Sequence, residues 1–169
     1  YQALYQNTTA INNTAVGYQA GYSNITGTYC TFFGYGAGYS STANDNTFIG
    51  GNAGRSVASG NANTFLGVDS GYYVTSGTNN TIIGRYTGNQ GGLDIRTASN
   101  YIVLSDGAGN PRLYSDGSGN WTAPAGTVSD SVGNLRSLPL NSQTSAYVAA
   151  ASDNGKVISD RKSTRLNSS

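Results

Sequence analysis

The stretch Asn46-Thr-Phe-Ile-Gly50 decides the fold, because variants of it return at regular intervals along the first half of the chain. Five copies end in glycine, and successive glycines are 17, 16, 17 and 17 residues apart. A second short block follows each copy, as in Gly51-Asn-Ala-Gly54. A unit this short cannot bury a core alone, so neighbouring units must stack on one another. The glycines that end the five copies are Gly17, Gly34, Gly50, Gly67 and Gly84.

The repeat unit is typical of one coil of β-structure. It contains a short strand, a break at the glycine, a second short extended piece and a polar turn such as Tyr22-Ser-Asn-Ile-Thr-Gly27. We therefore predict an all-β chain in which residues 1–92 form a repetitive parallel β-roll or β-solenoid. Equivalent strands of successive coils should lie about 4.8 Å apart. The threonines that open the strands are Thr14, Thr31, Thr47, Thr64 and Thr81.

Each predicted strand has two adjacent apolar residues, which predicts an oligomer. Neighbouring strand residues point to opposite faces, so both faces of the strand need to be buried. One face can fill the interior of the coil, whereas the other needs a partner chain. We expect a homotrimer, although the periodicity alone does not set the number of chains. The pairs are Ala15/Val16, Phe32/Phe33, Phe48/Ile49, Phe65/Leu66 and Ile82/Ile83.

Polar and aromatic residues also recur at fixed positions of the repeat. The residue before the strand threonine is Asn in four copies and Cys30 in one, and stacked Asn side chains can hydrogen-bond from coil to coil. Cys30 is interpreted as a substitution in this column rather than as a reactive thiol. Tyrosines form two further columns, which we expect to pack against neighbouring coils: Tyr5, Tyr22, Tyr39 and Tyr72 in one, and Tyr18 and Tyr35 in the other.

The pattern changes after Gln90-Gly-Gly92. Tyr101-Ile-Val-Leu104 has the composition of a strand, and Asp106-Gly107 and Asp116-Gly117 are hairpin-type turn dipeptides. We predict a β-hairpin region and linker over 93–125, with Arg112-Leu-Tyr114 as the return strand and Trp121 on a third. The twin Asp-Gly strings also allow a calcium interpretation, but the chain has no Glu for the distant ligand of such a loop. Turns are the preferred interpretation.

Composition argues against several functional classes. The chain has no His, which removes the usual catalytic triads, and Asp45 and Asp69 occupy different repeat positions, so no catalytic carboxylate pair is expected. A single Cys makes a Cys-based zinc cluster impossible. The net charge of +1 comes from the last ten residues, and no basic patch suits a phosphate backbone. We expect no enzyme activity, cofactor, metal, nucleic-acid partner or membrane insertion.

The strings NTAVGYQAGYSN, TFFGYGAGYSS and NTIIGRYTG resemble the Asn-Thr-Ala-Ile-Gly-type repeats of phage tail-fibre and tail-spike proteins. They are also similar to the head repeats of bacterial trimeric autotransporter adhesins, which implies a trimeric β-roll. The resemblance covers about residues 1–92. It implies a structural segment of a tail fibre that takes part in host attachment, with a host glycan or protein as receptor and the virion tail as its location.

The remainder of the chain carries further resemblances. Residues 100–122 look like a segment that follows such repeats in tail fibres, and 126–159 resemble part of a C-terminal fibre module. Residues 160–169, DRKSTRLNSS, look like a translated sequencing adaptor, so we expect them to be non-native and the chain to be a metagenomic fragment truncated at both ends. The alternatives are a bacterial surface adhesin head, a polysaccharide depolymerase spike and an ice-binding solenoid, the last suggested by the Thr column.

Overall fold

The computed structural model describes residues 1–124, 129–130 and 133–134, which fall into two units, 1–125 and 126–169. In the second unit, β11 (Ser129–Asp130) pairs antiparallel with β12 (Gly133–Asn134). The other predictions for 126–159, and the one for the adaptor-like tail at 160–169, lie outside the described residues.

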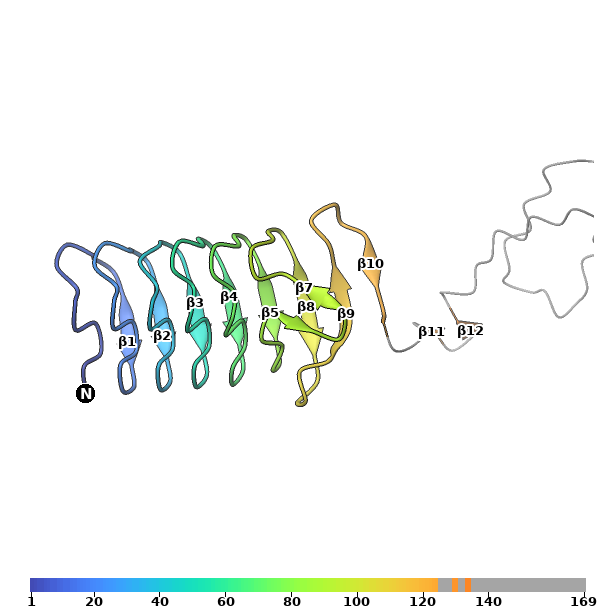
Figure 1. Cartoon of the computed structure of the whole chain (residues 1–169), viewed down its shortest axis with the longest axis horizontal. Helices are drawn as coiled ribbons and strands as arrows, with labels where there is room; N and C mark the ends of the chain where they lie inside the picture. Colours follow the sequence, from blue (N-terminus) through green and yellow to red (C-terminus); the bar gives the residue numbers. More distant parts are fainter. Residues whose placement is uncertain (125–128, 131–132, 135–169) are drawn as a thin grey trace, which may run out of the picture. The chain divides into compact units, whose positions relative to one another are not determined.

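The first unit is a parallel β-solenoid of short strands (Figure 1). The repeat copies supply β1 (Thr14–Val16), β2 (Thr31–Phe33), β3 (Thr47–Ile49), β4 (Thr64–Leu66) and β5 (Thr81–Ile83). Equivalent residues lie opposite one another, so that Phe32 pairs with Phe48 and Phe48 with Phe65. The described residues contain no helix. The predicted all-β solenoid is therefore confirmed, and the strands are three residues long because each glycine ends its strand.

The parallel stack continues past the predicted end of the array at residue 92. β8 (Ile102–Ser105) lacks the Asn-Thr motif, yet it pairs in parallel with β5 as a sixth rung. Only then does the sheet turn antiparallel, through β9 (Pro111–Ser115) and β10 (Trp121–Thr122), in agreement with the predicted hairpin region. A small antiparallel pair, β6 (Asn89–Gln90) and β7 (Leu93–Asp94), projects from the chain between β5 and β8.

The core is a column of side chains inside the coils. The first apolar residue of each strand points inward, and Phe32, Phe48, Phe65 and Ile82 are fully buried. Adjacent rings pack along the column, with centroids 5.8 Å apart for Phe32 and Phe48 and 5.0 Å apart for Phe48 and Phe65. The rest of the core combines small residues, among them Ala20, Ala37 and Ala53, with larger ones such as Val57 and Val74. Stacking thus supplies the core that a single coil lacks.

The second block of each repeat is a turn, which corrects the prediction of an extended piece. Gln19 and Gly21 have φ values of +54° and +59°, and this left-handed backbone bends the chain instead of extending it. The turns still stack, because Gly21 donates its N–H to the Ala37 carbonyl at 2.8 Å. The glycine at the strand end is required for another reason. A Cβ on Gly67 would lie 2.5 Å from the carbonyl oxygen of Gly84 in the next coil.

Candidate interaction surface

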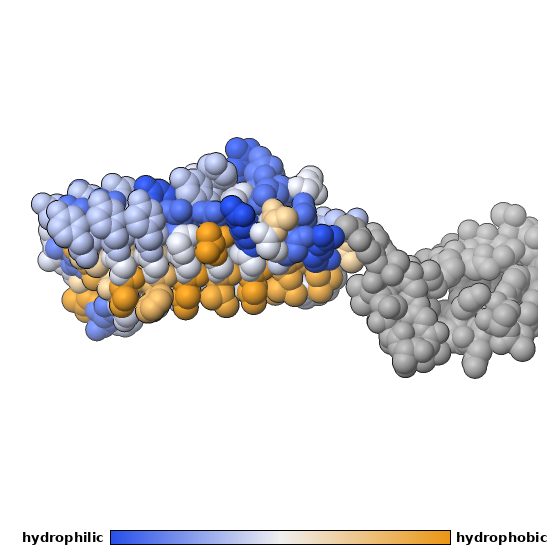
Figure 2. All heavy atoms as spheres, turned by 90° about the horizontal axis from the view of Figure 1, so that it is seen from below, coloured by the Kyte–Doolittle hydropathy of each residue, from blue (hydrophilic) through white to orange (hydrophobic). Residues whose placement is uncertain are grey.

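The second apolar residue of each strand points outward, and these residues form a continuous column that we call the outer stripe. Its exposed fractions run from 36% to 53%, although all six side chains are large and apolar. Figure 2 shows the resulting apolar band along the array. The outer stripe consists of Val16, Phe33, Ile49, Leu66, Ile83 and Leu104.

The stripe exists because of strand alternation. Phe48 and Ile49 are adjacent in the sequence, but Phe48 is fully buried inside the coil whereas Ile49 is 37% exposed on the outside. The in-register pairing of β1 to β5 and β8 repeats this arrangement at every rung. The predicted split of the apolar pairs between an inner and an outer face is therefore present in the solenoid, and no other described residue fully covers the outer members.

The same outer face carries the predicted threonine column. Thr14 and Thr64 are exposed and the other three threonines are half-buried, so the column lies beside the outer stripe and not inside the coil. None of the six parallel strands contains a charged residue. The described ion pairs, Arg85–Asp69, Arg96–Asp94 and Arg112–Asp106, are formed by residues outside these strands. The face is thus an uncharged surface of threonine and large apolar side chains.

Tyrosines of the first coils stack into two ladders, which lie four residues apart in the repeat. Tyr1, Tyr18 and Tyr35 stack with centroid separations of 5.7 and 5.4 Å, and Tyr5, Tyr22 and Tyr39 stack at 5.3 and 5.0 Å. In the next coil Arg55 takes the place of the tyrosine, and its guanidinium lies 4.7 Å from the centre of the Tyr39 ring. The expected packing between coils is therefore observed for Tyr5, Tyr22 and Tyr39 and for Tyr18 and Tyr35. The predicted member Tyr72 instead meets Tyr73 of its own coil at an interplanar angle of 71°.

The column of asparagines that precede the strand threonines also forms hydrogen bonds between coils, mainly with the backbone. Asn63 Oδ1 accepts the Asn80 N–H at 3.0 Å, and Asn63 Nδ2 donates to the Gly77 carbonyl at 2.9 Å. Cys30 interrupts the column, and its thiol instead lies 3.2 Å from the Ala43 carbonyl oxygen. Burial raises the pKa of the Cys30 thiol, which disfavours the nucleophilic thiolate.

The twin Asp-Gly strings form turns, as preferred from the sequence. Asp106 accepts hydrogen bonds from the backbone N–H groups of Ala108 and Asn110, each at 2.9 Å, and its carboxylate is also paired with Arg112. Asp116 accepts the equivalent bonds from Ser118 and Asn120. Within the described residues, no three His, Cys, Asp or Glu side chains lie close enough to share a metal ion. The same residues include no helix able to cross a bilayer.

Comparisons with protein-family models, with curated proteins and with solved structures find no match for this chain.

Proposed function

We propose that this chain is a structural segment of a phage tail fibre that assembles as a homotrimer and takes part in attachment to the host surface. The outer stripe is the observation that carries the proposal. A monomer rarely leaves an apolar column of this length in water, and such surfaces mark sites of association. The stripe spans six rungs, or about 24 Å at the usual strand spacing.

The width of the stripe favours three chains around an axis. It is one residue wide, because each strand has only three residues and the other outward residue is usually threonine. Three such columns can meet around a threefold axis and bury one another at every rung. Face-to-face packing of two sheets suits a broader apolar face. Each large apolar side chain that is transferred from water contributes on the order of 1 kcal/mol or more, and the lack of charge on the strands removes electrostatic repulsion between copies.

A parallel, in-register trimer also suits a fibre. Identical rungs then lie at the same level, so that Phe33 meets Phe33 and Leu66 meets Leu66 of the other chains. Further coils can be added at either end without changing the interface, which is how solenoids extend. The proposed partners are two further copies of the chain and a receptor on the host surface, and the proposed location is the virion tail.

Light scattering on the 169-residue chain tests the assembly. The expected mass is about 52 kDa, three times the 17.4 kDa of one chain, and it should not change between low and high salt because the interface is apolar. Ile49→Cys should form disulfides between chains under oxidation, since like residues meet at one level. A stable, soluble 17.4 kDa species contradicts the proposal.

The viral setting has a separate test. The gene neighbourhood on the source contig should contain phage structural genes. Genes of bacterial surface-protein secretion in that neighbourhood would instead support the adhesin head, which the same solenoid geometry can serve.

A further inference from the structure

The step between β5 and β8 is longer than the steps between the other parallel strands of the solenoid. Ile83 pairs with Leu104, 21 residues later, whereas Leu66 pairs with Ile83, 17 residues later. The additional residues form the pair of β6 and β7, which projects from the coil.

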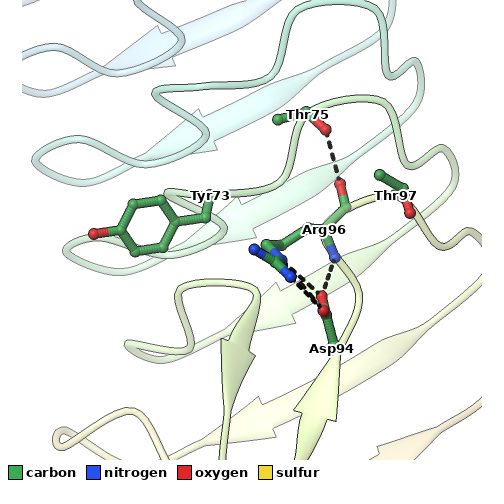
Figure 3. A pocket seen from close by; sticks show the side chains of 5 residues that line it. All are labelled: Tyr73, Thr75, Asp94, Arg96 and Thr97. Atoms are coloured by element: carbon green, nitrogen blue, oxygen red, sulfur yellow. Dashed lines mark hydrogen bonds and ion pairs between the residues drawn. The ribbon is translucent and has the colours of Figure 1, made fainter.

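A depression of about 510 Å³ lies where this projection meets the preceding coil (Figure 3). Its volume is in the usual range for small-molecule sites. The lining residues are Tyr73, Thr75, Asp94, Arg96 and Thr97.

The walls of the depression are held in place by hydrogen bonds to the core. The backbone N–H and the hydroxyl of Thr75 both donate to the Arg96 carbonyl, at 2.8 and 3.2 Å. The buried Tyr86 donates its hydroxyl to the carbonyl of Leu93 at 2.7 Å, directly before Asp94. The site is therefore formed before any ligand arrives, which lowers the entropy lost on binding.

One wall of the depression presents an aromatic ring. Tyr73 is 54% exposed, and its ring meets Tyr72 at an interplanar angle of 71° instead of stacking on it. Tyr18 and Tyr22 differ, since the rings of both adjacent coils stack against them. The electron-rich face of an aromatic ring attracts C–H groups that carry partial positive charge. Tyr73 thus offers a platform for a flat ligand with an apolar face.

The other wall is polar but electrically balanced. Asp94 Oδ1 accepts from Arg96 Nε at 3.0 Å and Asp94 Oδ2 accepts from Arg96 Nη2 at 2.7 Å, so the two side chains form a fixed fork. Arg96 Nη1 has no hydrogen-bond partner among the described residues, and the Thr97 hydroxyl can both donate and accept. The pair has no net charge, so an anionic ligand gains little here, whereas a ligand with several hydroxyl groups finds both donors and acceptors.

We propose that this depression binds one ring of a neutral saccharide, with Tyr73 against its C–H face and with Asp94, Arg96 and Thr97 bonded to its hydroxyl groups. The inference rests on the proposed function and deepens it, because it assigns a neutral glycan as the receptor. A single open site of this kind binds weakly. A trimer presents three of them, and simultaneous contacts with a glycan-covered surface raise the overall avidity.

Saturation-transfer NMR on the full chain tests the site, with methyl glycosides of glucose, galactose, mannose and N-acetylglucosamine as probes and N-acetylneuraminate as the charged comparison. At least one neutral glycoside should receive saturation from the protein. Tyr73→Ala and Arg96→Gln should each weaken its affinity by roughly tenfold, because they remove the platform and the free donor.

Two matched variants serve as controls. Tyr18→Ala removes a tyrosine that is 42% exposed but stacks between Tyr1 and Tyr35, and Arg85→Gln removes an arginine of similar exposure to Arg96 that pairs with Asp69. Both should bind as the parent chain does. Three results each overturn the inference: no neutral glycoside receives saturation, binding survives in Tyr73→Ala, or N-acetylneuraminate is preferred. Light scattering on the same samples separates the two proposals, since a trimer without saccharide binding contradicts only the glycan site.

Discussion

Asn46 accepts, through Oδ1, a hydrogen bond from the backbone N–H of Asn63 in the next coil, with 3.0 Å between the two atoms. Its Nδ2 donates to the Gly60 carbonyl of the same neighbouring coil at 2.8 Å. One buried amide therefore satisfies a donor and an acceptor of the adjacent backbone. The same arrangement recurs at Asn63 and Asn80, so the column joins coils where no strand pairing does.

Removal of one amide from this column should destabilise the solenoid. Asn63→Ala leaves the Asn80 N–H and the Gly77 carbonyl without their partner, at about 1–3 kcal/mol for each buried group. Urea unfolding at a fixed chain concentration measures the loss. Asn61→Ala is the control, because Asn61 is exposed and bonds only at the surface. Equal losses for the two variants contradict this role of the column.

Replacement of Cys30 by asparagine would complete the asparagine column and should stabilise the protein. The Cys30 sulfur accepts the backbone N–H of Asn46, but sulfur is a weak acceptor compared with an amide oxygen. Cys30→Asn replaces the sulfur with a stronger acceptor, and the new amide can also donate to the Ala43 carbonyl where the thiol now lies. We expect a gain of about 1 kcal/mol, seen as a higher melting temperature. A lower melting temperature means that the site is too small for the amide.

The strand-end glycine should not tolerate a side chain. Gly67 has a φ of +136°, and an added Cβ meets the Gly84 carbonyl oxygen of the next coil. Gly67→Ala should lower the free energy of unfolding by at least about 1–3 kcal/mol, the usual cost of local backbone strain, and should force the coils apart. Gly51 is a close control, since an added Cβ there meets nothing within 4 Å. Thermal unfolding should show a large loss for Gly67→Ala and a change within about 0.5 kcal/mol for Gly51→Ala.

Substitutions at neighbouring strand residues should affect folding in one case and trimer assembly in the other. Phe48→Ala opens a hole in the core and should cost about 3–5 kcal/mol per chain. Ile49→Ala removes an exposed side chain of the outer stripe, so it should leave the coil folded and weaken the trimer. Thr47→Ala, beside both, should change each property far less. Circular dichroism reports the fold and light scattering reports the mass. Loss of the β-spectrum in Ile49→Ala alone reverses the assignment of the two faces.

Acid should loosen the loop that joins β8 to β9. The Asn110 N–H, together with Arg112, lowers the pKa of Asp106 to about 2 from 3.8. Since the folded-state pKa lies below the ordinary value, the stabilisation is present above about pH 4 and is lost as the pH falls toward 2. NMR titration of the Ala108 and Asn110 amides should show their resonances moving in that window. Asp106→Asn should abolish the movement, and its persistence in that variant would assign it to another group.

One buried position inside the coils has a polar residue where the next two coils have an apolar one. Ser41 is fully buried, and its hydroxyl has no hydrogen-bond partner among the described groups. Valine stands at the equivalent position of the next two coils, as Val57 and Val74, and both are fully buried. Ser41→Val should therefore raise the free energy of unfolding by about 1 kcal/mol or more, because it removes an unpaired polar group and fills the interior.

The sequence by itself determined the strands and their stacking. The recurring Asn-Thr-apolar-apolar-Gly pattern places β1 to β5, since equivalent residues repeated along a chain can bury themselves only against one another. Alternation along a strand likewise places Phe48 and Ile49 on opposite faces.

Only the tertiary structure decided where non-equivalent segments meet. Ile102-Val-Leu104 has no repeat motif, yet it forms the sixth rung because Asn80 Oδ1 accepts the Tyr101 N–H at 2.9 Å and the backbone can pair whatever its side chains are. The turn at Gln19 depends on a left-handed backbone, which a glutamine in the sequence does not indicate. Tyr73 and Arg96 line one depression because the longer step between β5 and β8 brings distant residues together. A period in the sequence reveals which residues are equivalent, whereas contacts between unlike residues depend on the path of the folded backbone.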